Sequence, residues 1–163
     1  MKKHEEAQRT QPRLVRLVSL GCPKNTVDTG VAAGALLVDG FGLTADDDEA
    51  DVMWINTCAF LLSARKEAME EIRRACAWKK RRAGRLVVVA GCLPQWDKDG
   101  AVRAKFPLVD AWEGIDSPAG IGKVMKRLIA DKPVPERKTS SRVPGFTTKR
   151  PRVCRSNPRI SPI

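Results

Sequence analysis

The stretch DVMWINTC at residues 51–58 decides the fold, because it is a short run built on four consecutive apolar residues that stops at a cysteine. Runs of this kind are typical of strands that are buried on both faces of a parallel sheet. The stretches LVRLVSL at 14–20 and RLVVVA at 85–90 have the same character, and VDAWEGI at 109–115 is a weaker candidate. The sequence therefore predicts a sheet of about four strands.

Helical patterns separate these predicted strands. Asn25 can cap a helix that ends near Gly40. Four apolar residues recur along one side of this helix, namely Val27, Val31, Ala35 and Val38. Further helices are predicted over residues 63–82 and 118–130. This alternation indicates an α/β fold, in which an open and mostly parallel sheet carries helices on both faces.

The charge of the chain is concentrated at one end. Residues 123–163 contain 12 Lys and Arg against 2 acidic residues, which gives +10 of the total net charge of +11. We expect a flexible N-terminus over residues 1–12, one folded domain over 13–130 and a disordered basic tail over 131–163. Such a tail can contact RNA phosphates through its cations, although a solvated end without a partner is the simpler interpretation.

Membrane and secreted classes are not indicated. No apolar run approaches the ~20 residues that span a bilayer, and the charged start of the chain does not resemble a secretory signal. We therefore expect a cytoplasmic protein with no membrane contact. In that reducing compartment, five cysteines favour free thiols, metal sites or catalysis over a disulfide framework.

Three cysteines directly follow the three confident strands. They are Cys22, Cys58 and Cys92, which are separated by 36 and 34 residues, about one strand and one helix each. The carboxyl ends of parallel strands lie at one edge of a sheet, so these three cysteines are expected to converge there. Gly21 and Gly91 precede two of them and allow tight turns. The starts of the following helices are expected to lower the pKa of the thiols.

The number and spacing of these cysteines favour one class of metal centre. Structural zinc usually has four protein ligands, often in closely spaced pairs, whereas an iron–sulfur cluster held by three thiolates keeps one iron open for a further ligand. His4, the only histidine, is a weak candidate for a fourth ligand. Cys76 lies on the apolar side of a predicted helix and is expected in the core. Cys154, in the basic tail, is expected to be a free thiol.

Other patterns are weaker. The acidic residues within DDDEAD at 46–51 are expected in a solvated loop, and SPAGIGKV at 117–124 departs too far from a phosphate-binding loop to be one. The four tryptophans are expected to be packing residues, although Trp96 could line a site because it follows Cys92 closely.

At these residues the sequence resembles a known family. The stretches VSLGCPKNTVD at 18–28, ADVMWINTCAF at 50–60 and VVVAGCLPQ at 87–95 resemble the N-terminal domain of the radical-SAM methylthiotransferases. The CPKN motif at 22–25 is similar to that of the branch that modifies an aspartate of a small-subunit ribosomal protein, the RimO type. The resemblance implies that Cys22, Cys58 and Cys92 bind an auxiliary 4Fe-4S cluster whose open iron holds or donates sulfur.

In this family a second cluster, held by a C-x-x-x-C-x-x-C motif in a following domain, cleaves S-adenosylmethionine. This sequence has no such motif, so we expect a chain truncated before that domain, or one completed by a separate radical-SAM partner chain, and inactive alone. Three alternatives stay open: a non-catalytic iron–sulfur module that docks on RNA or the ribosome, a fragment of a tRNA-adenosine methylthiotransferase, and a zinc protein.

Overall fold

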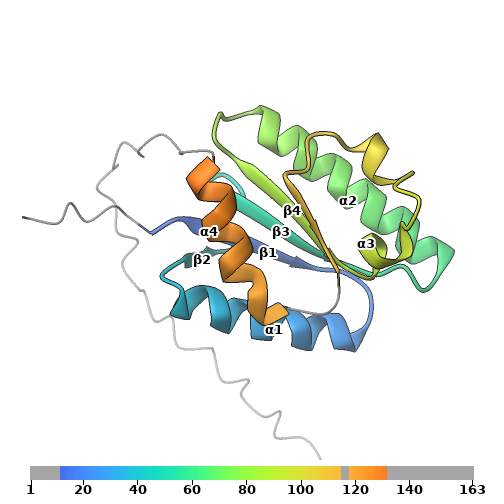
Figure 1. Ribbon diagram of the computed structural model, residues 1–163, viewed down its shortest axis with the longest axis horizontal. Coiled ribbons are helices and arrows are strands. Elements are labelled where there is room, and N and C mark those ends of the chain that lie inside the picture. The colour runs from blue at the N-terminus through green and yellow to red at the C-terminus, as the bar shows by residue number, and fades with distance from the viewer. Residues whose placement is uncertain (1–11, 115–117, 132–163) are drawn as a thin grey trace, which may run out of the picture.

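The computed structural model describes residues 12–114 and 118–131. The predicted flexible N-terminus and basic tail therefore lie almost wholly outside the described residues, as do His4 and Cys154. The fold prediction is confirmed: helices and parallel strands alternate in an α/β arrangement (Figure 1). No helix in the described part of the chain is long and apolar enough to cross a membrane.

Five parallel strands form one sheet in the order β2-β1-β3-β4-β5. Their bounds are β1 Leu14–Ser19, β2 Gly42–Thr44, β3 Val52–Thr57, β4 Leu86–Gly91 and β5 Ala111–Glu113. The three confident strand predictions correspond to β1, β3 and β4, and the weaker fourth corresponds to β5. β2 is an additional edge strand of three residues that the sequence did not signal.

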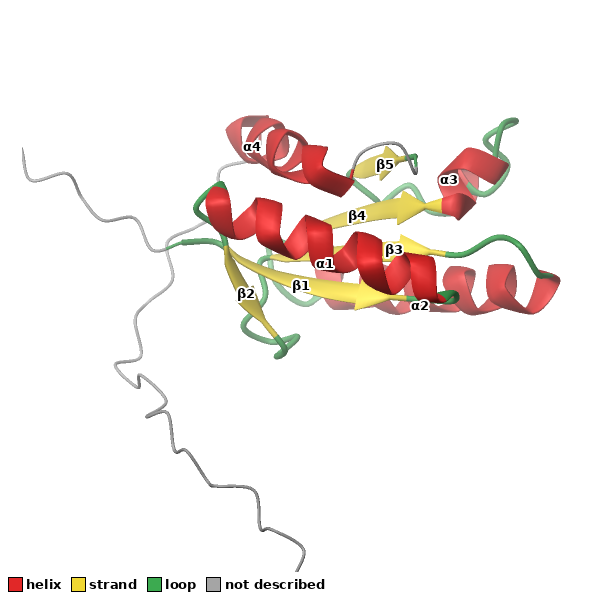
Figure 2. Cartoon of the chain, turned by 90° about the horizontal axis from the view of Figure 1, so that it is seen from below, coloured by secondary structure: helices red, strands yellow, loops and turns green. Residues whose placement is uncertain are grey.

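Helices cover both faces of the sheet (Figure 2). α1 (Pro23–Val38) and α4 (Ile121–Asp131) lie on one face, and α2 (Leu62–Lys80) lies on the other. The remaining helical elements are short: α3 (Cys92–Trp96), η1 (Arg103–Lys105) and η2 (Pro118–Gly120). Successive side chains of β3 and β4 point to opposite faces of the sheet and so belong to two hydrophobic cores. Trp54 and Val88 pack in the core under α1 and α4. Ile55 and Val89 pack in the core under α2. Cys76 is buried in the α2 core, as predicted.

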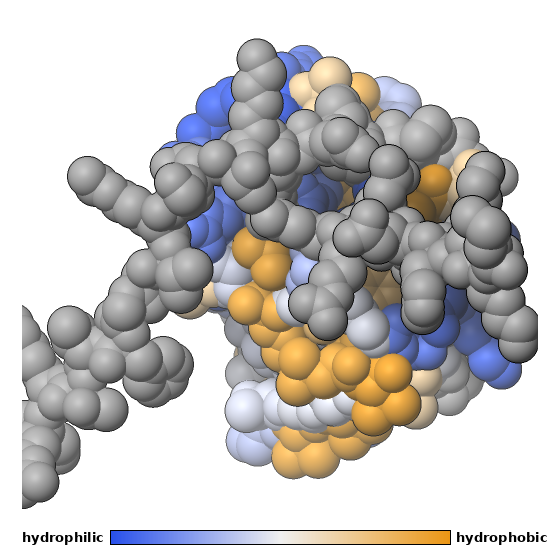
Figure 3. Space-filling view, turned by 90° about the vertical axis from the view of Figure 1, so that its left-hand side faces the viewer, coloured by the Kyte–Doolittle hydropathy of each residue, from blue (hydrophilic) through white to orange (hydrophobic). Residues whose placement is uncertain are grey.

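The apolar side of α1 was assigned wrongly from the sequence. Val27 and Val38 are 66% and 90% exposed, while the helix buries Ala32 and Leu36 against the sheet. The two sides of α1 are both poor in charge, so periodicity alone did not distinguish the inner side from the outer. Leu37 on the same helix and Leu43 in β2 are exposed as well. Hydrophobic areas are visible on the face of the molecule in Figure 3.

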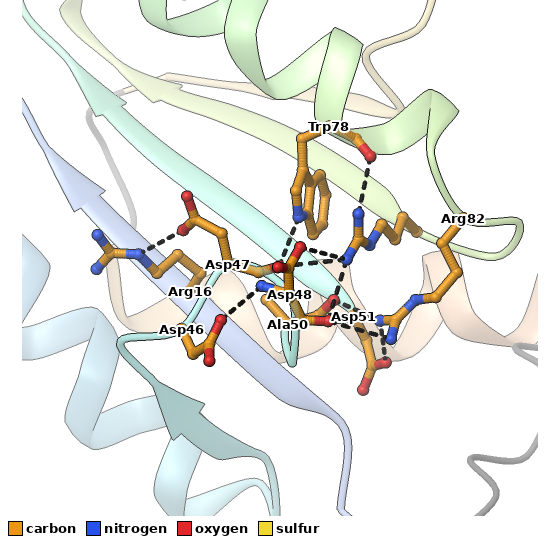
Figure 4. Close-up of polar contacts among 9 residues, drawn as sticks. Arg16, Asp46, Asp47, Asp48, Ala50, Asp51, Trp78 and Arg82 are labelled. Carbon is orange, nitrogen blue, oxygen red and sulfur yellow. Dashed lines mark hydrogen bonds and ion pairs between the residues drawn. The ribbon is translucent and has the colours of Figure 1, made fainter.

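Polar side chains tie the loop before β3 to α2, as the close-up shows (Figure 4). The Trp78 indole N–H donates to the carbonyl of Asp47 over 2.6 Å, and the Arg82 guanidinium contacts the carbonyl of Ala50 and a carboxylate oxygen of Asp51. Asp51 is buried and also accepts the backbone N–H of Leu14 at the start of β1. The acidic loop is therefore exposed over most of its length, as expected. Asp51 at its end is buried instead, and it links the start of β1 to Arg82.

Asp51→Asn is expected to lower the free energy of unfolding by about 2 kcal/mol, because the buried carboxylate that pairs with the partly exposed Arg82 is lost. Urea unfolding followed by tryptophan fluorescence measures the change. Asp47→Asn is the matched control: its ion pair with Arg16 is exposed, so its loss should change stability by less than about 0.5 kcal/mol. Equal effects of the two substitutions would contradict the assigned role of Asp51.

Candidate functional site

The order in which the chain adds strands to the sheet reverses between β1 and β3, which are parallel neighbours. From β1 the chain continues to β2 on one side, and from β3 it continues through β4 to β5 on the other. In open parallel sheets, ligands bind outside the carboxyl ends of the strands at such a switch point. Cys22 follows β1 and Cys58 follows β3, so the loops on both sides of the switch point each carry a cysteine.

Contacts at this edge bring the three cysteine turns together. A Cβ atom added to Gly21 would collide with Cys58 and would lie 3.1 Å from its sulfur. The backbone N–H of Ala59 donates to the sulfur of Cys92, which links the second turn to the third. Cys58 is 7% exposed, Cys92 is half-buried and Cys22 is exposed. The exposure of the three cysteines at this edge of the sheet therefore increases from Cys58 to Cys92 to Cys22.

Gly21 and Gly91 have φ values of +90° and +95°, in the left-handed region that side chains rarely adopt. A side chain at Gly91 would also approach the carbonyl oxygen of Thr57 to 2.5 Å. Both glycines thus serve the tight turns that the sequence predicts, and they permit close approach of adjacent backbones.

Two buried asparagines brace the first two turns. Asn25 was predicted as a helix cap, but α1 already begins at Pro23. The Asn25 side chain instead donates from Nδ2 to the carbonyl of Leu20 over 2.6 Å. Asn56, the penultimate residue of β3, donates from Nδ2 to the carbonyl of Asn25 over 3.1 Å. These bonds hold the turn of Cys22 against the end of the strand that leads to Cys58.

The hydroxyl of Thr57 braces the third turn. It donates to the carbonyl of Ala90 over 2.6 Å and accepts the backbone N–H of Leu93 over 3.3 Å. Thr57 and Leu93 are fully buried, so no water is expected to replace these bonds. The residues on either side of the turn that carries Cys92 are therefore fixed to β3.

Thr57→Val is expected to lower stability by about 1–2 kcal/mol, because it keeps the shape of the side chain and removes two buried hydrogen bonds to the backbone. The matched control is Thr26→Val on the exposed surface of α1, which should change stability by less than about 0.5 kcal/mol. Thermal unfolding of the metal-free chains provides the comparison, and indistinguishable melting temperatures for the two variants would refute this role of Thr57.

The titration of Cys92 differs from the expectation. Burial raises the pKa of its thiol, and the neighbouring thiols of Cys58 and Cys22 raise the pKa further. The Ala59 N–H and the ammonium of Lys24 act in the opposite direction with smaller effect. In the metal-free chain, crowding of like groups and burial therefore outweigh the helix ends that were expected to lower the pKa of the thiol.

Lys24 is the cation closest in sequence to this group of thiols. Its hydrogen bond with Asp28 raises its pKa, and the charges of Cys92 and Cys22 act in the same direction. The ammonium lies 2.5 Å from Asp28 Oδ2 and is well exposed. Lys24 is therefore placed to offset negative charge that gathers at the three cysteines.

Aromatic and apolar side chains surround the second turn. The guanidinium of Arg65 lies 4.7 Å from the centre of the Trp96 ring and donates to the carbonyl of Ala59 over 3.0 Å. Trp96 is 52% exposed, so the expectation that it is a packing residue of the core is wrong. Three consecutive apolar residues beside this turn are also exposed, namely Phe60, Leu61 and Leu62.

The donor set suits a sulfur-rich cluster better than a single ion. Within residues 12–114 and 118–131, no three His, Cys, Asp or Glu side chains are grouped to hold one metal ion. In a cluster each thiolate binds a different iron, so its ligands stand apart by the width of the cluster and need not meet at one point. The three thiols lie on neighbouring turns at one edge of the sheet, and thiolates are the ligands that such a cluster takes.

Sequence reasoning located the cysteines but missed their neighbours. Lys24, Asn56 and Thr57 were present in the quoted motifs, and nothing in their local pattern identified their roles. The charge of Lys24 acts on the thiols because α1 starts at this edge. Asn56 bonds to α1, and Thr57 bonds to the neighbouring strand. These are tertiary contacts that a linear spacing does not reveal.

One protein family and a group of methylthiotransferases are similar to this chain in sequence. The model of the uncharacterized protein family UPF0004 matches residues 14–114. Proteins named ribosomal protein uS12 methylthiotransferase RimO are similar to this chain: that of Syntrophus aciditrophicus is 42% identical over 119 residues, and that of Elusimicrobium minutum is 45% identical over 111 residues. These matches cover 72% and 68% of this chain but only 26% and 25% of the relatives. The chain thus spans about a quarter of the length of the curated relatives that it matches.

Proposed function

Because this chain belongs to the UPF0004 family, the N-terminal domain of the methylthiotransferases, we propose that Cys22, Cys58 and Cys92 hold an auxiliary 4Fe-4S cluster. One observation carries the proposal: three cysteine turns meet where β1, β3 and β4 end, with Gly21 packed against Cys58 and Ala59 bonded to Cys92. No other cysteine of the described residues lies at this edge, since Cys76 is buried in the α2 core.

Three protein ligands leave one iron of such a cluster without a ligand from the chain, and this iron, when the cluster is bound, supplies a position for a sulfur species. The residues around it have separable tasks. Cys58 anchors the ligand set in the core, while Cys22 and Cys92 carry it to the surface. Lys24 offsets the negative charge of the thiolates, and Arg65, which lies over the Trp96 ring, steadies the Cys58 turn through its bond to the Ala59 carbonyl.

The names of the relatives support a specific reaction. We propose that this domain serves the transfer of a methylthio group to the ribosomal protein uS12. The resemblance of the CPKN motif implies that the acceptor is an aspartate. Radical generation from S-adenosylmethionine then requires a radical-SAM domain supplied from outside these 163 residues, for example by a partner chain. Since the substrate is a ribosomal protein, we place this activity in the cytoplasm.

A chimeric enzyme tests this function. In the Syntrophus aciditrophicus relative, the part that matches this chain is replaced by residues 14–131, and the purified protein is supplied with uS12, S-adenosylmethionine and a reductant. Mass spectrometry of uS12 peptides is expected to show methylthiolated aspartate. Cys22→Ala in the chimera should abolish the product, whereas Cys76→Ala should retain it. A folded, iron-loaded chimera that makes no product, or one that is indifferent to Cys22→Ala, would contradict the proposal.

The principal alternative gives a different result in the same preparation. A non-catalytic iron–sulfur module that docks on RNA through the basic residues beyond 131 would bind ribosomal RNA with an affinity that falls as salt rises, and would transfer no methylthio group. A fragment of a tRNA-modifying enzyme would instead yield product on tRNA. The similarity to proteins named ribosomal protein uS12 methylthiotransferase supports the first function.

A further inference from the structure

A cavity of about 420 Å³ opens on the α1 and α4 side of the sheet, next to the turn that carries Cys92. Its walls come from α1, β3, β4, the end of β5 and the segment 118–124, and they include Asp28, Trp54, Gly91, Glu113 and Lys123. The size is within the ordinary range of small-molecule sites. We propose that this cavity binds a free α-amino acid with an apolar side chain.

The floor of the cavity is apolar. Trp54, Val88 and Ala90 line it from adjacent positions of β3 and β4, and all three are buried. Ile121 and Val124 line it from the side of α4. An amino-acid side chain placed here exchanges water for hydrocarbon contacts, so the apolar part of the ligand belongs against the sheet.

Charges of both signs line the same cavity from separate elements. Asp28 on α1 and Glu113 at the end of β5 are suited to an ammonium group, and Lys123 in the first turn of α4 is suited to a carboxylate. Lys24 engages Oδ2 of Asp28, and Arg127 lies 3.8 Å from Oε1 of Glu113, so each carboxylate retains a second oxygen for a ligand. The cavity lining thus offers carboxylate oxygens to an ammonium group and an ammonium to a carboxylate, the two ends of a zwitterion.

Three glycines also line the cavity, namely Gly91, Gly114 and Gly120. Gly91 is the residue before Cys92, but the Cys92 side chain packs against the core on the α2 side of the sheet, so the cavity and that thiol lie on different faces.

A titration of the metal-free full chain with L-methionine, followed by amide NMR shifts, tests the proposal. Saturable shifts are expected at cavity residues such as Ala90 and Gly114, with a Kd of about 1 mM or below. Two analogues keep the side chain: 3-(methylthio)propylamine lacks the carboxylate, and 4-(methylthio)butanoate lacks the amine. Each should bind at least about tenfold more weakly, since one of the two charged contacts is lost.

Matched variants locate the binding. Asp28→Asn and Lys123→Gln should each weaken L-methionine at least about fivefold, whereas Lys126→Gln, the same change three residues further along α4, should have no effect. Either analogue binding as well as L-methionine, equal effects at Lys123 and Lys126, or no saturable shift up to about 20 mM would overturn the proposal. The experiment uses no iron, so its failure would leave the cluster proposal untouched.

Discussion

Cys58→Ala is expected to abolish cluster binding. Cys58 is the most buried of the three proposed ligands, and it lies between the turns of Cys22 and Cys92. Its loss leaves two thiols at the edge, which is too few to retain a cubane cluster against excess chelator. After anaerobic reconstitution with iron and sulfide, iron bound per chain should fall at least about tenfold relative to the unmodified chain.

The matched control for this prediction is Cys76→Ala. Cys76 is equally buried but lies in the core under α2, away from the three turns. Cys76→Ala should lose some stability through the small cavity that it leaves, and it should bind iron and sulfide in unchanged amounts. A cluster that survives Cys58→Ala but disappears in Cys76→Ala would show that the assignment of ligands is wrong.

Gly91→Ala is expected to destabilise the metal-free fold by about 3–5 kcal/mol, because strain and overpacking act together. The backbone at Gly91 has φ = +95°, and a Cβ would approach the carbonyl of Thr57 to 2.5 Å and its nitrogen to 2.9 Å. These are backbone atoms of a central strand, so they cannot move away as the end of a flexible side chain can. Chemical unfolding gives the free energy directly.

Gly100→Ala separates the two causes. Gly100 also has a positive φ, of +73°, but a Cβ added there meets nothing within 4 Å. Its substitution carries the conformational strain alone and should cost about 1–2 kcal/mol. If Gly100→Ala is as destabilising as Gly91→Ala, close packing against Thr57 is not what requires glycine before Cys92.

The strands and the cysteines could be predicted because each depends on a local pattern. Four adjacent apolar residues in β3 and five in β4 suffice to indicate buried strands, and the topology of parallel strands then gathers Cys22, Cys58 and Cys92 at one edge. β2 was missed because three residues hold too little pattern to be distinguished from a loop. It is defined by its pairing with β1.

The errors at α1 have a different physical origin. Its exposed side carries Val27, Val31 and Val38, so the usual contrast between apolar and polar sides is absent. The buried side instead includes Asn25, whose polar side chain is satisfied by the Leu20 carbonyl. A buried asparagine with its partner five residues earlier is a feature of the tertiary structure, and a local pattern assigns such a residue to a cap.

The part of the site beyond the cysteines lay outside the reach of the sequence. Lys24 acts on Cys92 across 68 positions of the chain, and Thr57 bonds to Ala90 across 33. The cavity on the α1 and α4 side of the sheet depends on how α4 packs over β3 and β4. Such relations follow from packing, which the spacing of residue types does not encode.

The Mössbauer spectrum of the chain reconstituted with isotopically labelled iron and sulfide tests the central claim most directly. We expect the signals of a 4Fe-4S cluster. The isomer shift and quadrupole splitting of the iron without a protein ligand should change when a small thiolate is added, while those of the other three irons should not. Spectra of isolated iron sites, or of a cluster in which all irons ignore the added thiolate, would contradict the claim that three cysteines hold a cluster with one open iron.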